Sequence, residues 1–360
     1  MNIKLMKAVD ELIGRFLTRL ICSPAESVCP SVPESILVIR PGGIGDAVLL
    51  APAINHLRSK FPSADISILA ESRNSGVFDL IPAVNHLYCY DKPAEFIQVL
   101  RGRYDLVIDT EQWHRLSAVV ARLVRAPSKT GFDTNERRRM FSHTMPYSHD
   151  DYEAYSFLSL LEPLTDVSGY SLSYPFLNLN VNNEQYVDML LKSLEGKKFI
   201  TVFPGASIPE RRWGADKFNF VASELSKLGY SIVVIGGKEN REEGEYIAGS
   251  FGLNLAGRTS LAETASVIAR SLLLLSGDSG LLHIAVGLGM PTVSVFGPGR
   301  ALKWAPQGVR HKVLNQKLEC SPCTTFGTTP SCPDNVRCMK QISPEQVIDA
   351  VKEIISINRD

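Results

Sequence analysis

Short apolar runs alternate with amphipathic stretches along most of the chain. In the first half, strand-like runs occupy residues 36–40, 65–70, 86–90 and 106–109, and helical spacing of apolar residues occupies 47–60, 94–101 and 116–124. Strands that alternate with helices in this way indicate a parallel sheet with helices on both faces. The first half therefore predicts a Rossmann-like α/β domain.

The same alternation restarts after a polar stretch at 166–185, which is typical of an inter-domain connection. Strand-like runs occupy 199–205, 230–237, 271–277 and 291–297, and helical patterns occupy 217–228, 242–251, 261–269 and 280–289. We expect two Rossmann-like domains, at 35–180 and 181–360, that face a central cleft. Ligands of such sheets bind beyond the carboxyl ends of the strands.

The first 34 residues predict an amphipathic helix followed by a linker. Apolar residues recur there at helical spacing, at Val9, Leu12, Ile13, Phe16, Leu17 and Leu20. Charged residues lie between them, which excludes a secretory signal, and three prolines in 22–34 favour a linker. The helix either packs on its own domain or lies in a membrane interface. Without an export signal we expect a cytoplasmic protein.

Composition narrows the function classes. Lys+Arg and Asp+Glu both number 38, so the formal net charge is zero and bulk attraction to nucleic acid is not expected. Hydrophobic residues make up 44% and charged residues 21% of the chain, as in ordinary globular proteins. No uninterrupted apolar run approaches the roughly 20 residues of a membrane-spanning helix.

A glycine-rich loop follows the first strand. Gly43-x-Gly45-x-x-Val48 nearly matches the dinucleotide fingerprint, and Glu71 closes the second strand, so an NAD-dependent oxidoreductase is one alternative. Val48 replaces the third small residue, however, and the Asp46 carboxylate stands where a pyrophosphate would need free N–H groups. Asp46 is therefore either a helix-capping residue or a catalytic one.

The second half carries a candidate anion cradle. The segment SGDSGLLH at 276–283 joins a buried strand to a helix, whose free N–H groups suit a diphosphate, and Ser279 adds a hydroxyl donor. Two more loops of small residues follow strands at 204–207 and 296–299, and the first leads to Arg211 and Arg212. Each loop alone is an ordinary βα turn, but together they predict binding of a phosphorylated ligand.

These segments resemble the glycosyltransferase family that contains the lipopolysaccharide heptosyltransferases (glycosyltransferase family 9). The resemblance rests on IRPGGIGDAVLLAPAINHLRSKFP, FPGASIPERRW and SGDSGLLHIAVGLGMPTVSVFGP, and it extends from Ile36 to the C-terminus. It implies a two-domain GT-B fold and an inverting, metal-independent transfer of heptose from ADP-heptose. The implied acceptor is the Kdo/heptose region of the lipid A–core at the inner-leaflet surface, so a peripheral contact with the inner membrane is compatible with the resemblance.

The resemblance also implies residue roles. Asp46 matches the proposed general base, and Arg211 stands where relatives commonly carry a lysine that helps the diphosphate leave. The implied donor-binding residues are Ser207, Arg212, Glu239, Asp278, Ser279, Gly280 and His283, with Asn240 as the alternative to Glu239. The implied acceptor-binding residues are Gly43, Gly45, Arg115, Arg122 and Arg138. A solvated charged surface is the other account of these arginines, and a sugar-nucleotide-binding protein without turnover is a further alternative for the whole chain.

Four cysteines gather near the C-terminus, in the pattern Cys320-x2-Cys323-x8-Cys332-x5-Cys338. Disulfides are disfavoured in the cytoplasm, and four thiolates at short spacing resemble a structural Zn or Fe site. Reduced thiols without a metal are the alternative. We expect no catalytic role for this segment and no cofactor in the reaction.

Overall fold

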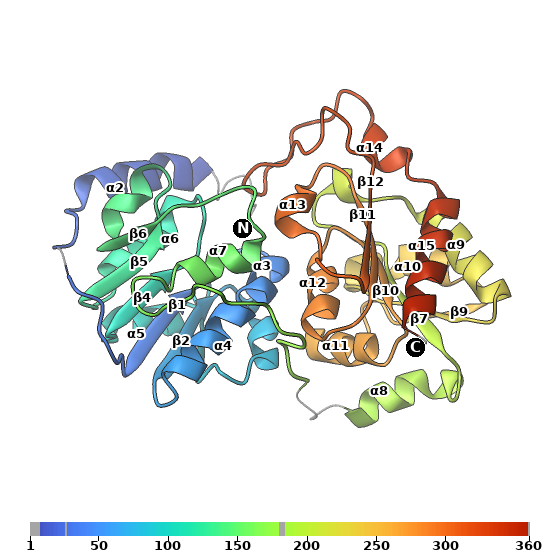
Figure 1. Ribbon diagram of the computed structural model, residues 1–360, viewed down its shortest axis with the longest axis horizontal. Coiled ribbons are helices and arrows are strands. Elements are labelled where there is room, and N and C mark those ends of the chain that lie inside the picture. The colour runs from blue at the N-terminus through green and yellow to red at the C-terminus, as the bar shows by residue number, and fades with distance from the viewer. Residues whose placement is uncertain (1–7, 26, 180–183, 359–360) are drawn as a thin grey trace. The chain divides into compact units, whose positions relative to one another are not determined.

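The computed structural model describes residues 8–25, 27–179 and 184–358. The chain divides into two compact units, Met1–Leu172 and Ser173–Asp360 (Figure 1). The sequence pattern predicts a boundary after residue 180 and a separate segment at residues 1–34. In the structure the boundary follows Leu172, and the first unit begins at Met1. Across the described ranges, no helix is both long and apolar enough to cross a membrane.

The first unit contains a six-stranded parallel sheet in the order β3-β2-β1-β4-β5-β6. Its strands are β1 Ser35–Ile39, β2 Asp65–Ala70, β3 His86–Cys89, β4 Leu106–Asp109, β5 Ser128–Phe132 and β6 His143–Met145. Its helices are α2 Arg15–Leu20, α3 Ile44–Leu49, α4 Ala51–Lys60, α5 Pro93–Arg101, α6 Arg115–Leu123 and α7 Glu153–Ser159. The predicted helix at 47–60 is two helices, because the chain turns at Leu50 and Pro52 opens α4.

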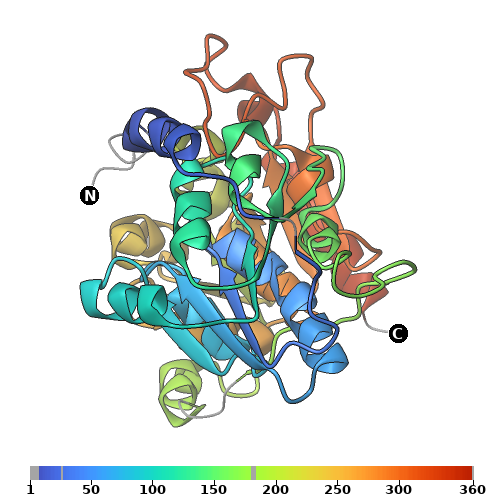
Figure 2. The same ribbon diagram turned by 90° about the vertical axis from the view of Figure 1, so that its left-hand side faces the viewer.

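Helices cover both faces of this first sheet. Alternate residues of β1 point to opposite faces, and Leu37 and Ile39 pack with Val99 of α5 and with Ala118 and Ala121 of α6. In Figure 2, which turns this unit towards the viewer, the strands lie between the two helical layers. Because β1 pairs with both β2 and β4, the direction of winding reverses between β1 and β4. Ligands of doubly wound sheets bind at such a reversal point.

The second unit repeats this topology. Its six parallel strands lie in the order β12-β11-β10-β7-β8-β9, so the reversal falls between β7 and β10. The strands are β7 Phe199–Phe203, β8 Ser231–Val234, β9 Gly252–Asn254, β10 Leu274–Gly277, β11 Thr292–Phe296 and β12 His311–Asn315. The helices are α8 Glu184–Leu191, α9 Ala215–Lys227, α10 Arg241–Ala248, α11 Leu261–Ala269, α12 Gly280–Gly287, α13 Ala301–Trp304, α14 Arg337–Lys340 and α15 Pro344–Ile357.

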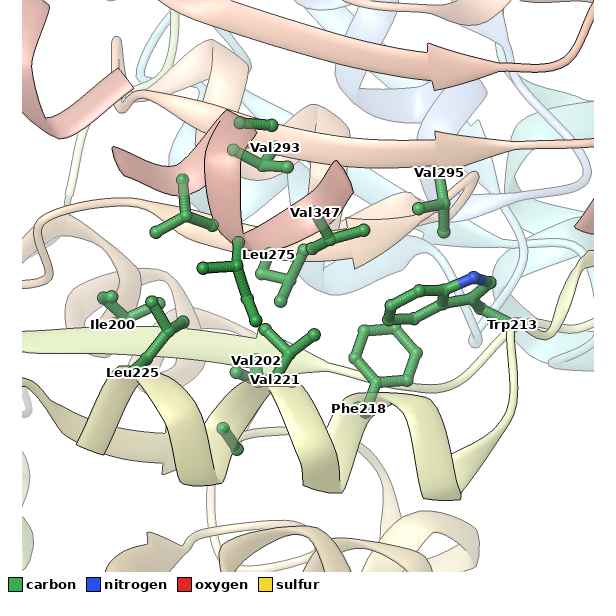
Figure 3. Packing of buried hydrophobic residues seen from close by; sticks show 14 of the residues in the cluster. Ile200, Val202, Trp213, Phe218, Val221, Leu225, Leu275, Val293, Val295 and Val347 are labelled. Carbon is green, nitrogen blue, oxygen red and sulfur yellow. The ribbon is translucent and has the colours of Figure 1, made fainter. Parts of the chain in front are cut away.

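One large apolar cluster joins the sheet of the second unit to α9, α10 and α15 (Figure 3). Phe218, Val221 and Leu225 recur at helical spacing on α9 and are at most 1% exposed. Trp213 packs edge-on against Phe218 and donates its indole N–H to the carbonyl of Ile342, at 3.0 Å. The loop after β7 is thereby tied to the start of α15, which holds the nearby reversal point in a fixed place.

Candidate functional site

Buried charges organise the reversal point of the first unit. Arg40 follows β1 and is 1% exposed; its Nη1 donates to the carbonyl of Thr110 at 2.9 Å, and its Nη2 lies 3.2 Å from the Glu111 carboxylate. Burial opposes ionisation of Glu111, but the charges of Arg40, His114 and Arg137 outweigh it and hold the pKa of Glu111 below its ordinary value. The ends of β1 and β4 are therefore locked together by an ionised pair.

Asp46 lies in the first turn of α3, directly beside this pair of strand ends. The helix begins after Gly43, which has an extended backbone, and no side chain caps it. Gly43 occupies the N-cap position, and Asp46 is the acidic residue of the first turn. Its Oδ1 accepts a hydrogen bond from Nε2 of Gln112, at 3.2 Å, and Gln112 follows the end of β4. Gly45 lies in the same turn as Asp46.

A hydrogen-bonded chain extends from Asp46 into the unit. Gln112 Nε2 also donates to Oε1 of Glu153 at 2.6 Å, and the hydroxyl of Tyr147 donates to Oε2 of Glu153 at 3.1 Å. Burial, followed by the charges of Glu153 and Asp46, raises the pKa of Tyr147 far above its ordinary value, so its hydroxyl stays a donor. The sequence did not single out Gln112, Glu153 or Tyr147. The sequence signal that could have identified Gln112 is its place among the polar residues directly after β4, because that strand borders the reversal point.

The arginines expected to bind the acceptor lie in different surroundings. Arg115 is 5% exposed, and its guanidinium pairs with Glu136 at 2.9 Å and with Glu11 at 3.0 Å. Arg122 is half-buried and donates to a backbone carbonyl at 3.0 Å. Arg138 is exposed, with an aspartate 3.8 Å away. Arg115 is thus held by carboxylates of its own unit, whereas Arg138 is accessible.

The reversal point of the second unit brings a cation and a carboxylate together. Arg211 lies in a short 3₁₀ turn, Pro209–Arg211, after β7, and Asp278 follows β10. Nη1 of Arg211 is 3.0 Å from Oδ2 of Asp278, and both side chains are largely buried. An added Cβ at Gly299, in the loop after β11, would lie 2.1 Å from the same carboxylate oxygen. Each of the three small-residue loops predicted from the sequence therefore contributes to this cluster. The loop at 204–207 leads to Arg211, the segment 276–283 contains Asp278, and the loop at 296–299 contains Gly299.

The N-terminus of α12 adjoins this ion pair. Ser279 caps the helix by accepting the backbone N–H of Leu282 at 3.3 Å, and its hydroxyl also lies 2.8 Å from that of Ser276. Gly280 is the first residue of the helix. First-turn N–H groups of a helix carry partial positive charge and favour a phosphate.

Several buried side-chain nitrogen atoms around this point have no hydrogen-bond partner within the described part of the chain. They are Nε of Arg211, Nδ1 of His283 and Nδ2 of Asn240. Burial, and then the Arg211 charge, lowers the pKa of His283 to about 4, so the ring is neutral at physiological pH. Unpartnered buried polar atoms are costly, which points to a polar ligand as their partner.

The remaining residues expected to bind the donor are more exposed. Ser207 and Glu239 are exposed, and Arg212 is exposed with its Nε 3.4 Å from the carbonyl of Ala206. Asn240, the alternative to Glu239, is 1% exposed and accepts the backbone N–H of Gly237 at 3.2 Å. The buried Asn240 shapes the loop after β8, whereas Glu239 is accessible to a nucleoside.

The cysteine-rich segment does not form the metal site that its spacing suggested. All four of its cysteines are free thiols, Cys320 exposed, Cys323 and Cys332 half-buried and Cys338 buried. Across the described residues, no group of His, Cys, Asp or Glu is arranged to hold a metal ion. The four thiols are chemically suited to Zn or Fe, but this arrangement does not support either metal. Burial raises the pKa of the Cys338 thiol, which favours its neutral form.

Comparisons with known proteins agree with this geometry. The model of glycosyltransferase family 9 (heptosyltransferase) matches residues 94–331, well over half of the chain. Lipooligosaccharide heptosyltransferase 2 of Campylobacter jejuni is 26% identical over 334 residues, which cover 89% of this chain and 98% of the relative.

Solved structures show the same fold. E. coli ADP-heptose LPS heptosyltransferase II aligns with a TM-score of 0.74 at 21% identity, over 91% of this chain and 100% of its own. E. coli heptosyltransferase WaaC with ADP-2-deoxy-2-fluoro heptose aligns with a TM-score of 0.68 at 18% identity, over 89% and 99%. The predicted α/β class, with two Rossmann-like domains of the GT-B type, is confirmed.

Proposed function

Because the chain belongs to glycosyltransferase family 9, the heptosyltransferases, we propose that it transfers a heptose from ADP-heptose to the Kdo/heptose region of a lipopolysaccharide core, with inversion at the anomeric carbon. The observation that carries the proposal is the cluster of Arg211, Asp278 and the N-terminus of α12 at the reversal point of the second sheet. A diphosphate is the ligand that such a cluster of cationic and N–H donors favours. The relatives' names supply the nature of the sugar.

The donor contacts follow from the groups that lack internal partners. Nε of Arg211 is available to a phosphate oxygen while Nη1 keeps its contact with Asp278, so the carboxylate positions the guanidinium. The α12 N–H groups and the neutral His283 add donors without adding a full charge. Ser207, Arg212 and Glu239 extend the donor site on the exposed side, with Glu239 facing the nucleoside.

The reaction needs a base that takes the proton of the acceptor hydroxyl, and hydrogen-bond donors that stabilise the charge on the leaving diphosphate. The acceptor hydroxyl oxygen attacks the anomeric carbon from the face opposite the diphosphate, and its proton passes to the Asp46 carboxylate. The bond between the anomeric carbon and the diphosphate oxygen breaks, and its electron pair leaves with ADP. Arg211 and the N–H groups of α12 stabilise the charge that grows on that oxygen. No step needs a metal or a cofactor.

The acceptor is assigned to the first unit, which supplies the base. Gly43 and Gly45 leave room beside Asp46 for a sugar hydroxyl, and the exposed Arg138 and the half-buried Arg122 suit the carboxylate and phosphate groups of a lipid A–core acceptor. The proposal places the enzyme in the cytoplasm, beside the inner leaflet that anchors such an acceptor.

Measuring acceptor-dependent ADP release tests the proposal. Purified protein is incubated with ADP-heptose and a panel of truncated core acceptors that end in Kdo or in heptose, and product stereochemistry is read by NMR. We expect release with at least one acceptor and an inverted glycosidic linkage. Donor binding without release from any acceptor would show a non-catalytic binding protein, and binding of NAD(H) but not of ADP-heptose would show the oxidoreductase alternative.

A further inference from the structure

The N-terminal helix packs with its polar side inward and its apolar side outward. This helix comprises a π-helical turn at Asp10–Gly14 and α2 at Arg15–Leu20. Asp10 and Thr18 are only 5% and 0% exposed. Leu12, Phe16 and Leu20 are 77%, 63% and 66% exposed, and Ile13 is also exposed. We call Leu12, Ile13, Phe16 and Leu20 the apolar stripe.

Polar contacts fix this orientation. The Asp10 carboxylate accepts the backbone N–H groups of Arg115 and Leu116, each at 2.8 Å, and so caps the start of α6. An added Cβ at Gly14 would lie 2.9 Å from Cβ of Arg115, so the helix approaches α6 closely at that point. Arg15 and Arg19 lie 3.3 and 3.2 Å from the Glu136 carboxylate. The apolar stripe is therefore held outward by specific bonds on the opposite side of the helix.

Arginines that form no ion pair with another described residue lie around the C-terminal end of this helix. Nη1 of Arg139 reaches the carbonyl of Arg19 at 3.5 Å, and Nε of Arg122 reaches that of Cys22 at 3.0 Å. A cavity of about 350 Å³ beside them is lined by Arg122, Arg125 and Lys129, together with residues of the linker after the helix. Lys129 is buried, but the charges within the helix and its ion pairs cancel, so Arg122, Arg125 and Arg139 leave the described part of this surface net positive.

We propose that the apolar stripe and these basic groups dock the protein on an anionic lipid bilayer. An amphipathic helix that presents large apolar side chains next to basic residues binds in the headgroup region, with its apolar side among the acyl chains. Each basic group near an anionic leaflet adds to the attraction. A neutral soluble partner would leave Arg122, Arg125 and Arg139 without counter-charges. Docking does not depend on the transfer reaction proposed above.

Co-sedimentation of the full-length protein with vesicles tests this proposal. Vesicles of equal parts phosphatidylglycerol and phosphatidylcholine should sediment the protein, and phosphatidylcholine vesicles or high salt should release most of it. Replacing Leu12 and Phe16 together by serine should weaken partitioning about 100-fold or more, because two large apolar side chains no longer insert. The matched control replaces Phe220 on α9 and Leu228 directly after it by serine. Both are also exposed apolar residues, and their replacement should leave partitioning unchanged.

A second readout keeps the test independent of helix stability. Phe16→Trp preserves the apolar stripe, and its fluorescence should shift to the blue on anionic vesicles, whereas Phe220→Trp should not shift. ADP release from a water-soluble truncated acceptor should be unchanged in the Leu12/Phe16 double variant, which separates docking from catalysis. Equal sedimentation of the double variant, no blue shift of Phe16→Trp, or a dimer in light scattering that the double variant disrupts without any vesicle binding would each overturn the proposal.

Discussion

Replacing Asp46 by asparagine should remove catalysis and leave the fold and donor binding nearly intact. Asparagine has the same size, and its side-chain oxygen can still accept the hydrogen bond that Gln112 donates to Asp46 at 3.2 Å. It cannot take a proton from the acceptor. General bases typically contribute about 10²–10⁴ in rate. We therefore expect kcat to fall by that factor, which corresponds to about 2.7–5.5 kcal/mol of transition-state stabilisation.

The structural cost of this change is much smaller. Gly43 occupies the capping position of α3 and asparagine can keep the contact with Gln112, so we expect the main structural loss to be the favourable interaction of a carboxylate with the helix dipole. Such an interaction is worth about 0.3–1 kcal/mol. The loss of activity should therefore exceed the loss of stability several-fold, and a structural role alone would not produce that ratio.

The assay compares kcat for ADP release, the dissociation constant of ADP by calorimetry, and unfolding in urea. Asp79→Asn is the matched control, because Asp79 is an exposed aspartate in the short helical turn Ser75–Leu80 of the same unit. The control should retain activity. Near-normal turnover of Asp46→Asn, or a loss of stability large enough to explain its inactivity, would refute the assignment of Asp46 as the base.

Three further predictions concern the donor site and the buried charges. Gly299→Ala places a Cβ against the Asp278 carboxylate and should weaken ADP binding roughly tenfold or more by calorimetry, since that carboxylate must move. The pKa of His283 is about 4 in the folded state against 6.5 when unfolded, so the free energy of unfolding should fall as the pH drops from 6.5 towards 4. The expected fall at pH 5 is about 2 kcal/mol, and His283→Gln should abolish that part of the pH dependence in urea titrations. Arg137→Met removes the cationic partner of the fully buried Asp109 and should destabilise the protein by about 3–5 kcal/mol. Arg138→Met, at the exposed pair with Asp133, should change stability by at most about 1 kcal/mol in the same denaturation assay.

Periodicity predicted the strands that are continuous apolar runs, and it missed those that are not. β5 (Ser128–Phe132) is fully buried but contains Lys129, whose ammonium donates to the carbonyls of Val124 and Ala126 at 2.7 and 2.9 Å. A charged residue type interrupts the apolar pattern, although backbone carbonyls only three and five residues away satisfy its ammonium. β12 (His311–Asn315) is half-exposed and polar for a different reason, since it lies at the edge of its sheet.

Helix amphipathicity predicted the N-terminal helix but not which of its sides is buried. The apolar residues at helical spacing favoured a buried stripe in one interpretation and a membrane interface in the other. The inward side is chosen by Asp10, which caps α6 more than a hundred residues later in the chain. A contact of that range has no local signature. The same limit applies to Gln112 and Glu153, which meet across 41 residues to complete the surroundings of Asp46.

The two sheets have the same strand order, yet their reversal points carry opposite chemistry. In the first unit the residues after β1 and β4 place Asp46 beside Gln112, so an acceptor of protons is held there by a neutral amide. In the second unit the corresponding residues, after β7 and β10, supply Arg211 and the N–H groups of α12. Inverting transfer needs both: a carboxylate where a hydroxyl loses its proton, and donors where a diphosphate gains charge. Because the strand order is identical in the two units, the division between acceptor and donor that we propose depends on the few residues that follow these four strands.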